Sequence, residues 1–193
     1  DLAGLDAGVV VQAYLKDSRD DLAELIAWSA ARPRPIGVRL VKGAYWDAET
    51  IQAKAEGWPI PVYEHKDETD ANYEVQTTFL LEHRDLLRPA IGSHNIRSLA
   101  YAMAAAQALG LSENSYEIQM LYGMAEPIKD ALVGMGQRVR VYTPYGDLLP
   151  GMAYLVRRLL ENTSNDSFLH EQARGVPLDE LLAPPRPHDV TTA

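Results

Sequence analysis

Short apolar runs rich in β-branched residues alternate with longer amphipathic segments along most of this chain. The runs typical of strands are residues 9–15, 36–44, 88–93, 116–121 and 138–142. The segments with helical spacing of apolar residues are 17–31, 47–56, 69–83, 96–109, 126–133 and 151–162. The valine-rich run 9–15 is continuous, which favours a strand buried on both faces. Five strand-then-helix units in succession predict a parallel sheet with right-handed crossovers.

Two α/β folds are consistent with this pattern. A (β/α)8 barrel has eight such units in about 250 residues, so five units in 193 residues correspond to its C-terminal five-eighths. The alternative is a complete doubly wound sheet of five strands. A nucleotide-binding version of that fold would usually carry a glycine-rich turn after a strand, and no such spacing is present. We expect a partial barrel over residues 1–170 and a polar, proline-rich tail or linker over 171–193.

Composition excludes several classes of protein. The formal net charge is −9 and no dense basic stretch occurs, which argues against nucleic acid as a partner. The absence of cysteine excludes disulfides, thiolate metal sites and a cysteine nucleophile, and the five scattered histidines favour no metal site. No apolar run approaches the roughly 20 residues of a membrane span. The default expectation is a cytoplasmic protein, and a chain that opens at Asp1 without Met is expected to be a piece of a longer one.

Functional groups gather at the carboxyl ends of the strands in either fold. In the second strand, Arg39, Val41 and Gly43 alternate to one side, so Arg39 is predicted to point into the barrel. A buried arginine needs a carboxylate or an electron-rich ligand as its partner. Gly43 and Ala44 lack bulk, so a flat ligand can approach the backbone here.

Polar residues also mark other strands. Ser93, His94 and Asn95 stand where a strand meets a helix, and free backbone N–H groups at such a point favour an anion such as a pyrophosphate. The alternative is that Ser93 or Asn95 only caps the helix. Gln12 and Gln119 are single amides in apolar strands, and each is either a satisfied core residue or a hydrogen-bonding partner for a heterocyclic ring edge.

The helix expected at 151–162 carries Tyr154, Arg157, Arg158 and Glu161 at spacings that place them on one face. Two adjacent guanidinium groups beside an aromatic hydroxyl can bind a small carboxylate, because arginine presents planar donors that match that group. On spacing alone, an ordinary solvated helix face is the more frequent case.

Three motifs then resemble one family. They are residues 38–47 (VRLVKGAYWD), 116–124 (YEIQMLYGM) and 142–168. Together they resemble the proline dehydrogenase family, and most closely the proline dehydrogenase domain of the bifunctional bacterial proline utilization A proteins. The resemblance covers roughly residues 8–170 in consistent order.

The resemblance implies a flavoprotein that holds FAD in a (β/α)8 barrel, with this chain supplying strands four to eight and the last helix. It implies oxidation of L-proline to Δ1-pyrroline-5-carboxylate by hydride transfer to N5 of FAD, with electrons passed to a quinone, as the first step of proline catabolism. The alternatives are a catalytically inactive barrel fragment and a different barrel enzyme that acts on small carboxylates or phosphorylated metabolites.

The resemblance also implies roles for individual residues. The catalytic position is Arg39, beside the flavin N5. The FAD site is implied to comprise Gln12, Arg39, Val41, Lys42, Gly43, Ala44, Tyr45, Trp46, Ser93, His94, Asn95, Gln119 and Glu161. The proline pocket is implied to comprise Tyr45, Leu121, Tyr142, Tyr154, Arg157 and Arg158. An aldehyde dehydrogenase domain is expected downstream in the parent protein, together with peripheral contact at the inner face of the cell membrane.

Overall fold

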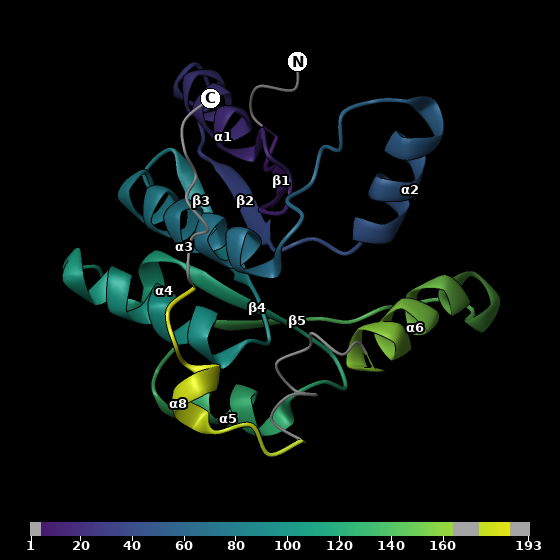
Figure 1. The fold of residues 1–193 in the computed structure, drawn as a ribbon. Helices are drawn as coiled ribbons and strands as arrows, with labels where there is room; N and C mark the ends of the chain where they lie inside the picture. The colour runs from purple at the N-terminus through teal and green to yellow at the C-terminus, as the bar shows by residue number, and fades with distance from the viewer. Residues whose placement is uncertain (1–4, 164–173, 186–193) are drawn as a thin grey trace.

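The computed structural model describes residues 5–163 and 174–185. Its centre is a five-stranded sheet in which every neighbouring pair is parallel, as the sequence predicts. Along the sheet the strands follow one another in chain order (Figure 1). They are β1 (Gly8–Gln12), β2 (Ile36–Val41), β3 (Leu87–Gly92), β4 (Glu117–Leu121) and β5 (Val139–Tyr142).

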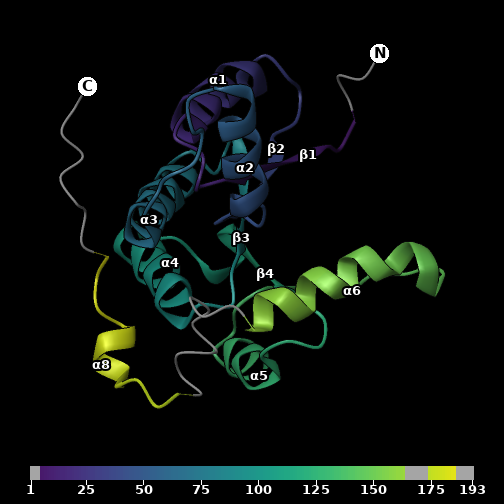
Figure 2. The same ribbon diagram turned by 45° about the vertical axis from the view of Figure 1, so that its right-hand side comes forward.

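Helices occupy the segments between the strands and after β5. They are α1 (Ser18–Ala30), α2 (Trp46–Glu56), α3 (Lys66–Glu82), α4 (Ile96–Ala108), α5 (Glu126–Gly134), α6 (Leu148–Thr163) and the short α8 (Leu178–Leu181), with a 3-10 turn η1 (Glu113–Ser115). Figure 2 shows α1, α3 and α4 as one layer beside the sheet. Within the described ranges, no helix has both the length and the apolar character needed to cross a bilayer.

The strand order excludes one of the two folds that the sequence left open. Doubly wound sheets reverse direction at a switch point, as in the order 3-2-1-4-5-6. Here the order runs β1-β2-β3-β4-β5 without reversal. Right-handed crossovers that always step in the same direction place their helices on one face of the sheet. The doubly wound alternative is therefore wrong.

The core lies between the sheet and the helix layer. Alternate strand residues such as Val38, Leu40 and Ile118 are fully buried on that side, where they meet Tyr73 and Leu80 of α3. The opposite face is open and mostly polar. The prediction that residues 9–15 form a strand buried on both faces is wrong, because alternate residues of β1 reach the open face and leave Val10 58% exposed.

Element ends differ from the sequence prediction by a few residues. β1 ends at Gln12 and is followed by a turn, and β2 ends at Val41 because Gly43 takes a left-handed φ of +139°. α3 begins at Lys66 instead of residue 69, with the Glu68 carboxylate accepting the His65 backbone N–H at 3.0 Å. α6 begins at Leu148, and part of the expected tail forms α8.

The two outer strands have open edges, and this leads to a prediction for the isolated chain. In the described part of the chain, β1 pairs only with β2, and β5 pairs only with β4. Unpaired strand edges template association with other chains. We expect the isolated 193-residue chain to self-associate at concentrations on the order of micromolar. Sedimentation velocity measures this, and a concentration-independent monomer with a cooperative melt would contradict it.

Candidate functional site

Aromatic and cationic side chains from three elements converge at the carboxyl ends of the strands. The guanidinium carbon of Arg39, on the open face of β2, lies 5.3 Å from the centre of the Tyr142 ring at the end of β5. The Tyr142 ring lies 6.0 Å from that of Tyr154 on α6. The structure therefore brings together residues that are more than 100 positions apart in the sequence.

The arginine pair of α6 is turned toward the protein. Arg157 donates a hydrogen bond to the Tyr45 hydroxyl, and the Arg158 guanidinium carbon lies 5.2 Å from the centre of the Tyr154 ring. Both arginines are half-buried. The residues of α6 on the exposed side are instead apolar, with Leu155 and Val156 exposed by 45% and 47%. This orientation differs from that of a solvated polar helix face.

Several donors in this cluster lack a partner. The Nε atoms of Arg39 and Arg157 and the hydroxyl of Tyr154 are buried, and none has a hydrogen-bond partner within the described residues. A buried polar atom left without a partner costs about 1–3 kcal/mol. Two of these three groups are cationic. The arrangement is therefore suited to an electron-rich or anionic ligand, which would supply the missing acceptors.

His94 lies beside the same cluster. Its Nε2 accepts the backbone N–H of Leu121 at 2.9 Å, so the proton of the neutral ring is on Nδ1. Burial, together with the nearby positive charges of Arg158, Lys129 and Arg39, lowers the pKa of His94 to about 4. The imidazole is therefore neutral at pH 7, and the positive charge of the site resides on arginine and lysine.

The turn between β3 and α4 is held by local hydrogen bonds. The Asn95 side chain accepts the Ser98 N–H at 3.1 Å, and the Ser93 hydroxyl accepts the Asn95 N–H at 3.1 Å. The capping role that the sequence allowed for Asn95 is therefore present. It places Ser93, His94 and Asn95 together at the same edge as Arg39.

The segment that follows β2 is held by packing and by an ion pair. A Cβ on Gly43 would lie 2.4 Å from the Tyr14 ring, so only glycine fits there. The Lys42 ammonium lies 2.5 Å from an Asp70 carboxylate oxygen. Burial lowers the pKa of Lys42, although the Asp70 carboxylate acts to raise it. The Trp46 indole N–H donates to the Tyr63 carbonyl at 2.7 Å.

The remaining predicted residues are less closely grouped. Gln12 is half-buried at the end of β1, opposite Val41, and Ala44 is exposed. Leu121 is buried at the end of β4. Glu161 lies on α6, but its side chain is outside the described residues. In the described part of the chain, no three His, Cys, Asp or Glu side chains are grouped so that they could hold a metal ion.

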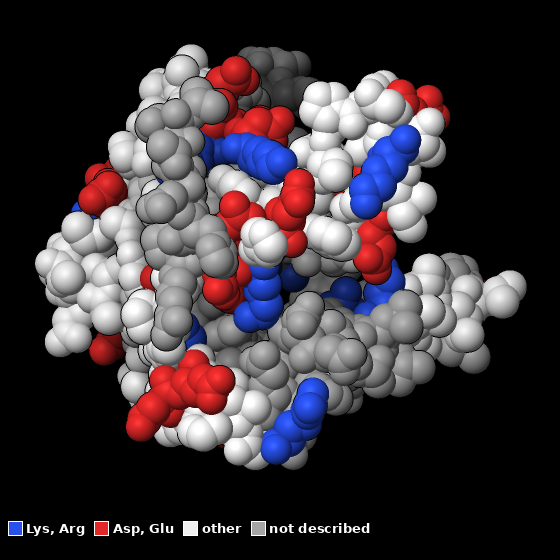
Figure 3. All heavy atoms as spheres, in the orientation of Figure 1, with Lys and Arg blue, Asp and Glu red and all other residues white. Residues whose placement is uncertain are grey.

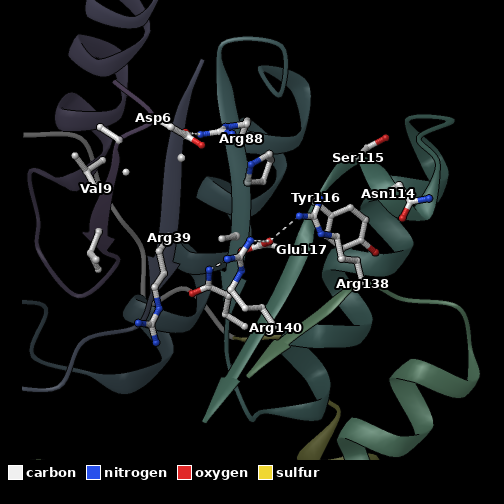
Figure 4. Close-up of a pocket in the computed structure, with 17 residues that line it drawn as sticks. Asp6, Val9, Arg39, Arg88, Asn114, Ser115, Tyr116, Glu117, Arg138 and Arg140 are labelled. Carbon is white, nitrogen blue, oxygen red and sulfur yellow. Dashed lines mark hydrogen bonds and ion pairs between the residues drawn. The ribbon is translucent and has the colours of Figure 1, made fainter. Parts of the chain in front are cut away.

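Gln119 belongs to a separate polar network on the open face of the sheet. It donates to Glu117 at 2.6 Å, and Arg140 pairs with the same carboxylate at 2.8 Å. Burial acts to raise the pKa of Glu117, but the hydrogen bonds from Arg140 and Gln119 outweigh it and lower the pKa. This network lines a hollow of about 470 Å³ on the open face, and Arg39 lines the same hollow (Figure 4).

A family model described as proline dehydrogenase matches residues 1–171. The chain belongs to the proline dehydrogenase family. The resemblance of the three sequence motifs is therefore confirmed.

Individual relatives agree with this assignment. The bifunctional protein PutA of Klebsiella aerogenes is 39% identical over 194 residues, which cover 96% of this chain and 15% of the relative. Proline dehydrogenase 2 of Bacillus subtilis is 32% identical, over 82% of this chain and 46% of the relative. The crystal structure of proline utilization A from Bdellovibrio bacteriovorus, inactivated by N-propargylglycine, superposes with a TM-score of 0.89 at 55% identity, over 92% of this chain and 19% of that one. The chain thus spans less than half the length of each of these proteins.

Two residues beside this cluster were not among the sequence candidates. A Cβ on Gly92 would lie 2.9 Å from both the Leu40 carbonyl oxygen and the Val41 Cγ1, so the approach of β3 to β2 requires glycine beside Arg39. Lys129 of α5 is 5% exposed and donates to the Leu121 carbonyl at 3.1 Å. The sequence carried a signal for Lys129, because it is a lysine beside Ile128 and Leu132 on the apolar side of an amphipathic helix.

Proposed function

We propose that this chain forms the substrate-binding part of an FAD-dependent proline dehydrogenase that oxidises L-proline to Δ1-pyrroline-5-carboxylate. The observation that carries the proposal is the set of buried donors without partners, Arg39 Nε, Arg157 Nε and the Tyr154 hydroxyl. A carboxylate and the polar edge of a flavin together would supply the acceptors that these groups lack. Membership of the proline dehydrogenase family supports the same substrate.

The α6 arginines suit the substrate carboxylate. Arg157 and Arg158 would bind it through charge-assisted hydrogen bonds, each worth roughly 1.5–3 kcal/mol. Tyr142 and Tyr154 lie beside these arginines with rings 6.0 Å apart and would exclude water from the proline ring, with Tyr45 and Leu121 as further walls. Fixing the ring in one orientation provides the positioning that the oxidation requires.

The residues at the ends of β2 and β3 fit a flavin. The Arg39 Nε is buried, has no hydrogen-bond partner among the described residues, and lies beside Gly92. When bound, the flavin supplies the acceptor for the hydride of proline. Arg39 would place positive charge beside its reacting edge. The remaining residues proposed to hold it are Gln12, Val41, Lys42, Gly43, Ala44, Tyr45, Trp46, Ser93, His94, Asn95, Gln119 and Glu161.

The finer fold assignment is part of the same proposal. Strands in unbroken chain order, with a helix layer on one side and a polar open face on the other, suit strands four to eight of a (β/α)8 barrel. Upstream strands of the parent protein would cover the open face. The second candidate function is that of an inactive barrel fragment, and an open face is also what an incomplete barrel would have. The flavin absorbance spectrum of the purified full-length protein separates the two.

The partners of the parent protein are predictions of the same kind. We propose a quinone as electron acceptor, an aldehyde dehydrogenase domain downstream, and a cytoplasmic location with peripheral contact at the inner face of the cell membrane. Nucleic acid is not among the proposed partners, because acidic and basic side chains are interspersed over the face shown in Figure 3.

Arg39→Met in the full-length protein tests the proposed flavin site. Because the variant removes positive charge beside the flavin, we expect the reduction potential to fall by roughly 30–60 mV, which corresponds to one charge-assisted hydrogen bond. Reduction by proline should slow by about 10-fold. The control is Arg88→Met, which removes an arginine on the same face that pairs with Asp6. Potentials and rates that match the wild type in both variants would remove Arg39 from the flavin site.

A further inference from the structure

The last residue of β4 is held by side chains on both of its backbone polar groups. β3 ends at Gly92, which pairs with Gln119, so the register would place His94 beside Leu121. The imidazole of His94 accepts the Leu121 N–H at 2.9 Å. It takes the place of the backbone carbonyl that a longer β3 would offer to this N–H. The carbonyl oxygen of Leu121 accepts a hydrogen bond from the Lys129 ammonium at 3.1 Å.

Lys129 is unusual because its charge is buried. Its side chain is only 7% exposed, whereas its ion-pair partner Glu126, at 2.6 Å, is 60% exposed. Burial of an ammonium group is unfavourable unless it is paired and hydrogen-bonded. Lys129 therefore joins a solvent-exposed carboxylate to a strand end that lies inside the protein.

The turn between β4 and α5 explains why such a connection is needed. Gly123 has a φ of +76° and Ala125 a φ of +52°, and Ala125 is the one non-glycine residue with positive φ in the described ranges. An alanine in this region is strained. The Lys129–Leu121 bond spans the turn and ties the first turns of α5 to the strand end.

Leu121 is also adjacent to the proposed proline pocket. It is the register partner of Tyr142, and the next N–H, that of Tyr122, donates to the Tyr142 carbonyl at 3.0 Å. Its side chain lies on the same face of β4 as that of Gln119, which is the open face. A shift of the Leu121 peptide would therefore move one wall of the pocket relative to Tyr142.

We propose that Lys129 is a positioning residue for the substrate, which acts by fixing the Leu121 peptide and with it the pocket wall. This inference rests on the proposed function. Lys129 lies on α5, outside the arginine pair and outside the residues proposed to hold the flavin. Its effect should therefore appear in substrate binding and ring-size selectivity, with little effect on the reaction of bound substrate.

The experiment compares Lys129→Met with wild type in the full-length, flavin-loaded protein, with L-proline and its six-membered homologue L-pipecolate as substrates. Loss of the buried donor should raise the KM for proline by about 10-fold and leave kcat within about twofold. A displaced wall should also change the proline-to-pipecolate ratio of kcat/KM by at least about threefold. A loss of folded protein would lower kcat for both substrates equally and leave that ratio unchanged.

Two controls isolate the contact. Glu126→Gln removes the exposed charge but keeps an amide oxygen as acceptor for the Lys129 ammonium and leaves the Lys129–Leu121 bond in place, so its kinetics should match wild type. Lys129→Arg restores a cationic donor and should return KM to within about threefold of wild type. If the methionine variant does not fold, Lys129→Gln replaces it. The glutamine side chain is shorter and its amide does not reach the Leu121 carbonyl as the ammonium does, so the same rise in KM is expected.

The outcomes separate the two hypotheses. An unchanged KM and an unchanged substrate ratio in Lys129→Met overturn the positioning role, and so does a Glu126→Gln variant with the same defect. A flavin-loaded wild-type protein that does not oxidise L-proline overturns the proposed function itself, and the positioning role with it.

Discussion

Replacing Arg157 or Arg158 with lysine is expected to lower kcat/KM for L-proline by roughly 30- to 1000-fold, or about 2–4 kcal/mol in transition-state binding. The reason is geometric. Lysine keeps the charge, but a point charge does not reproduce the planar donor pair that matches a carboxylate. Both arginines are half-buried on the inner side of α6, so bulk water does not fully replace the lost donors.

The measurement is steady-state kinetics of each variant in the full-length protein, with bound flavin confirmed by absorbance. Arg34→Lys, in the exposed loop before β2, is the matched control. Its effect should remain within about 0.5 kcal/mol, as is usual for surface substitutions. Near-wild-type kcat/KM in both Arg157→Lys and Arg158→Lys would refute the carboxylate site and the assignment of the proline pocket.

Gly43→Ala is expected to destabilise the protein by about 3 kcal/mol or more and to release the flavin. Two costs combine at this position. The backbone φ of +139° is unfavourable for alanine, and the added Cβ would lie 2.4 Å from the ring of Tyr14, which is buried at 3% exposure. Relief of the overlap requires movement of the segment between Lys42 and Trp46, which carries much of the proposed flavin site.

Gly57→Ala separates these two costs. Gly57 ends α2 with a φ of +68°, but a Cβ there would have no atom within 4 Å. This control should therefore lose only about 1 kcal/mol, the conformational cost of alanine in the left-handed region. Thermal unfolding and flavin absorbance of both variants provide the comparison, and equal losses at Gly43 and Gly57 would show that the contact with Tyr14 is unimportant.

The local sequence pattern was sufficient to locate the helices and strands, but it did not show what surrounds them. The alternation of β-branched runs and amphipathic segments located the strands and the helices between and after them to within a few residues, because hydrophobic periodicity directly reflects which side of an element is covered. It was misleading at Val10, since a run of valines looks the same whether one face or two are covered. Only the assembled sheet shows that Val10 reaches the open face.

Contacts between distant residues were beyond the reach of sequence reasoning. The spacing in α6 placed Tyr154 and the two arginines on one face, but whether that face meets solvent or protein depends on how α6 docks beside Tyr45 and Tyr142. Likewise, Gln119 read as a single amide, and the pairing of its neighbour Glu117 with Arg140 on β5 became clear only in the assembled sheet.

The sequence by itself determined the class of fold, the helical face that carries the arginine pair, and the family, because each of these depends on local spacing or on contiguous motifs. The tertiary structure alone decided the strand order and the close approach of Gly92 to Leu40 and Val41. It also revealed the support of Leu121 by His94 and Lys129. These features arise where the ends of separate strands meet, and the geometry of such a meeting is set by packing across the whole sheet, not by the residues of any one segment.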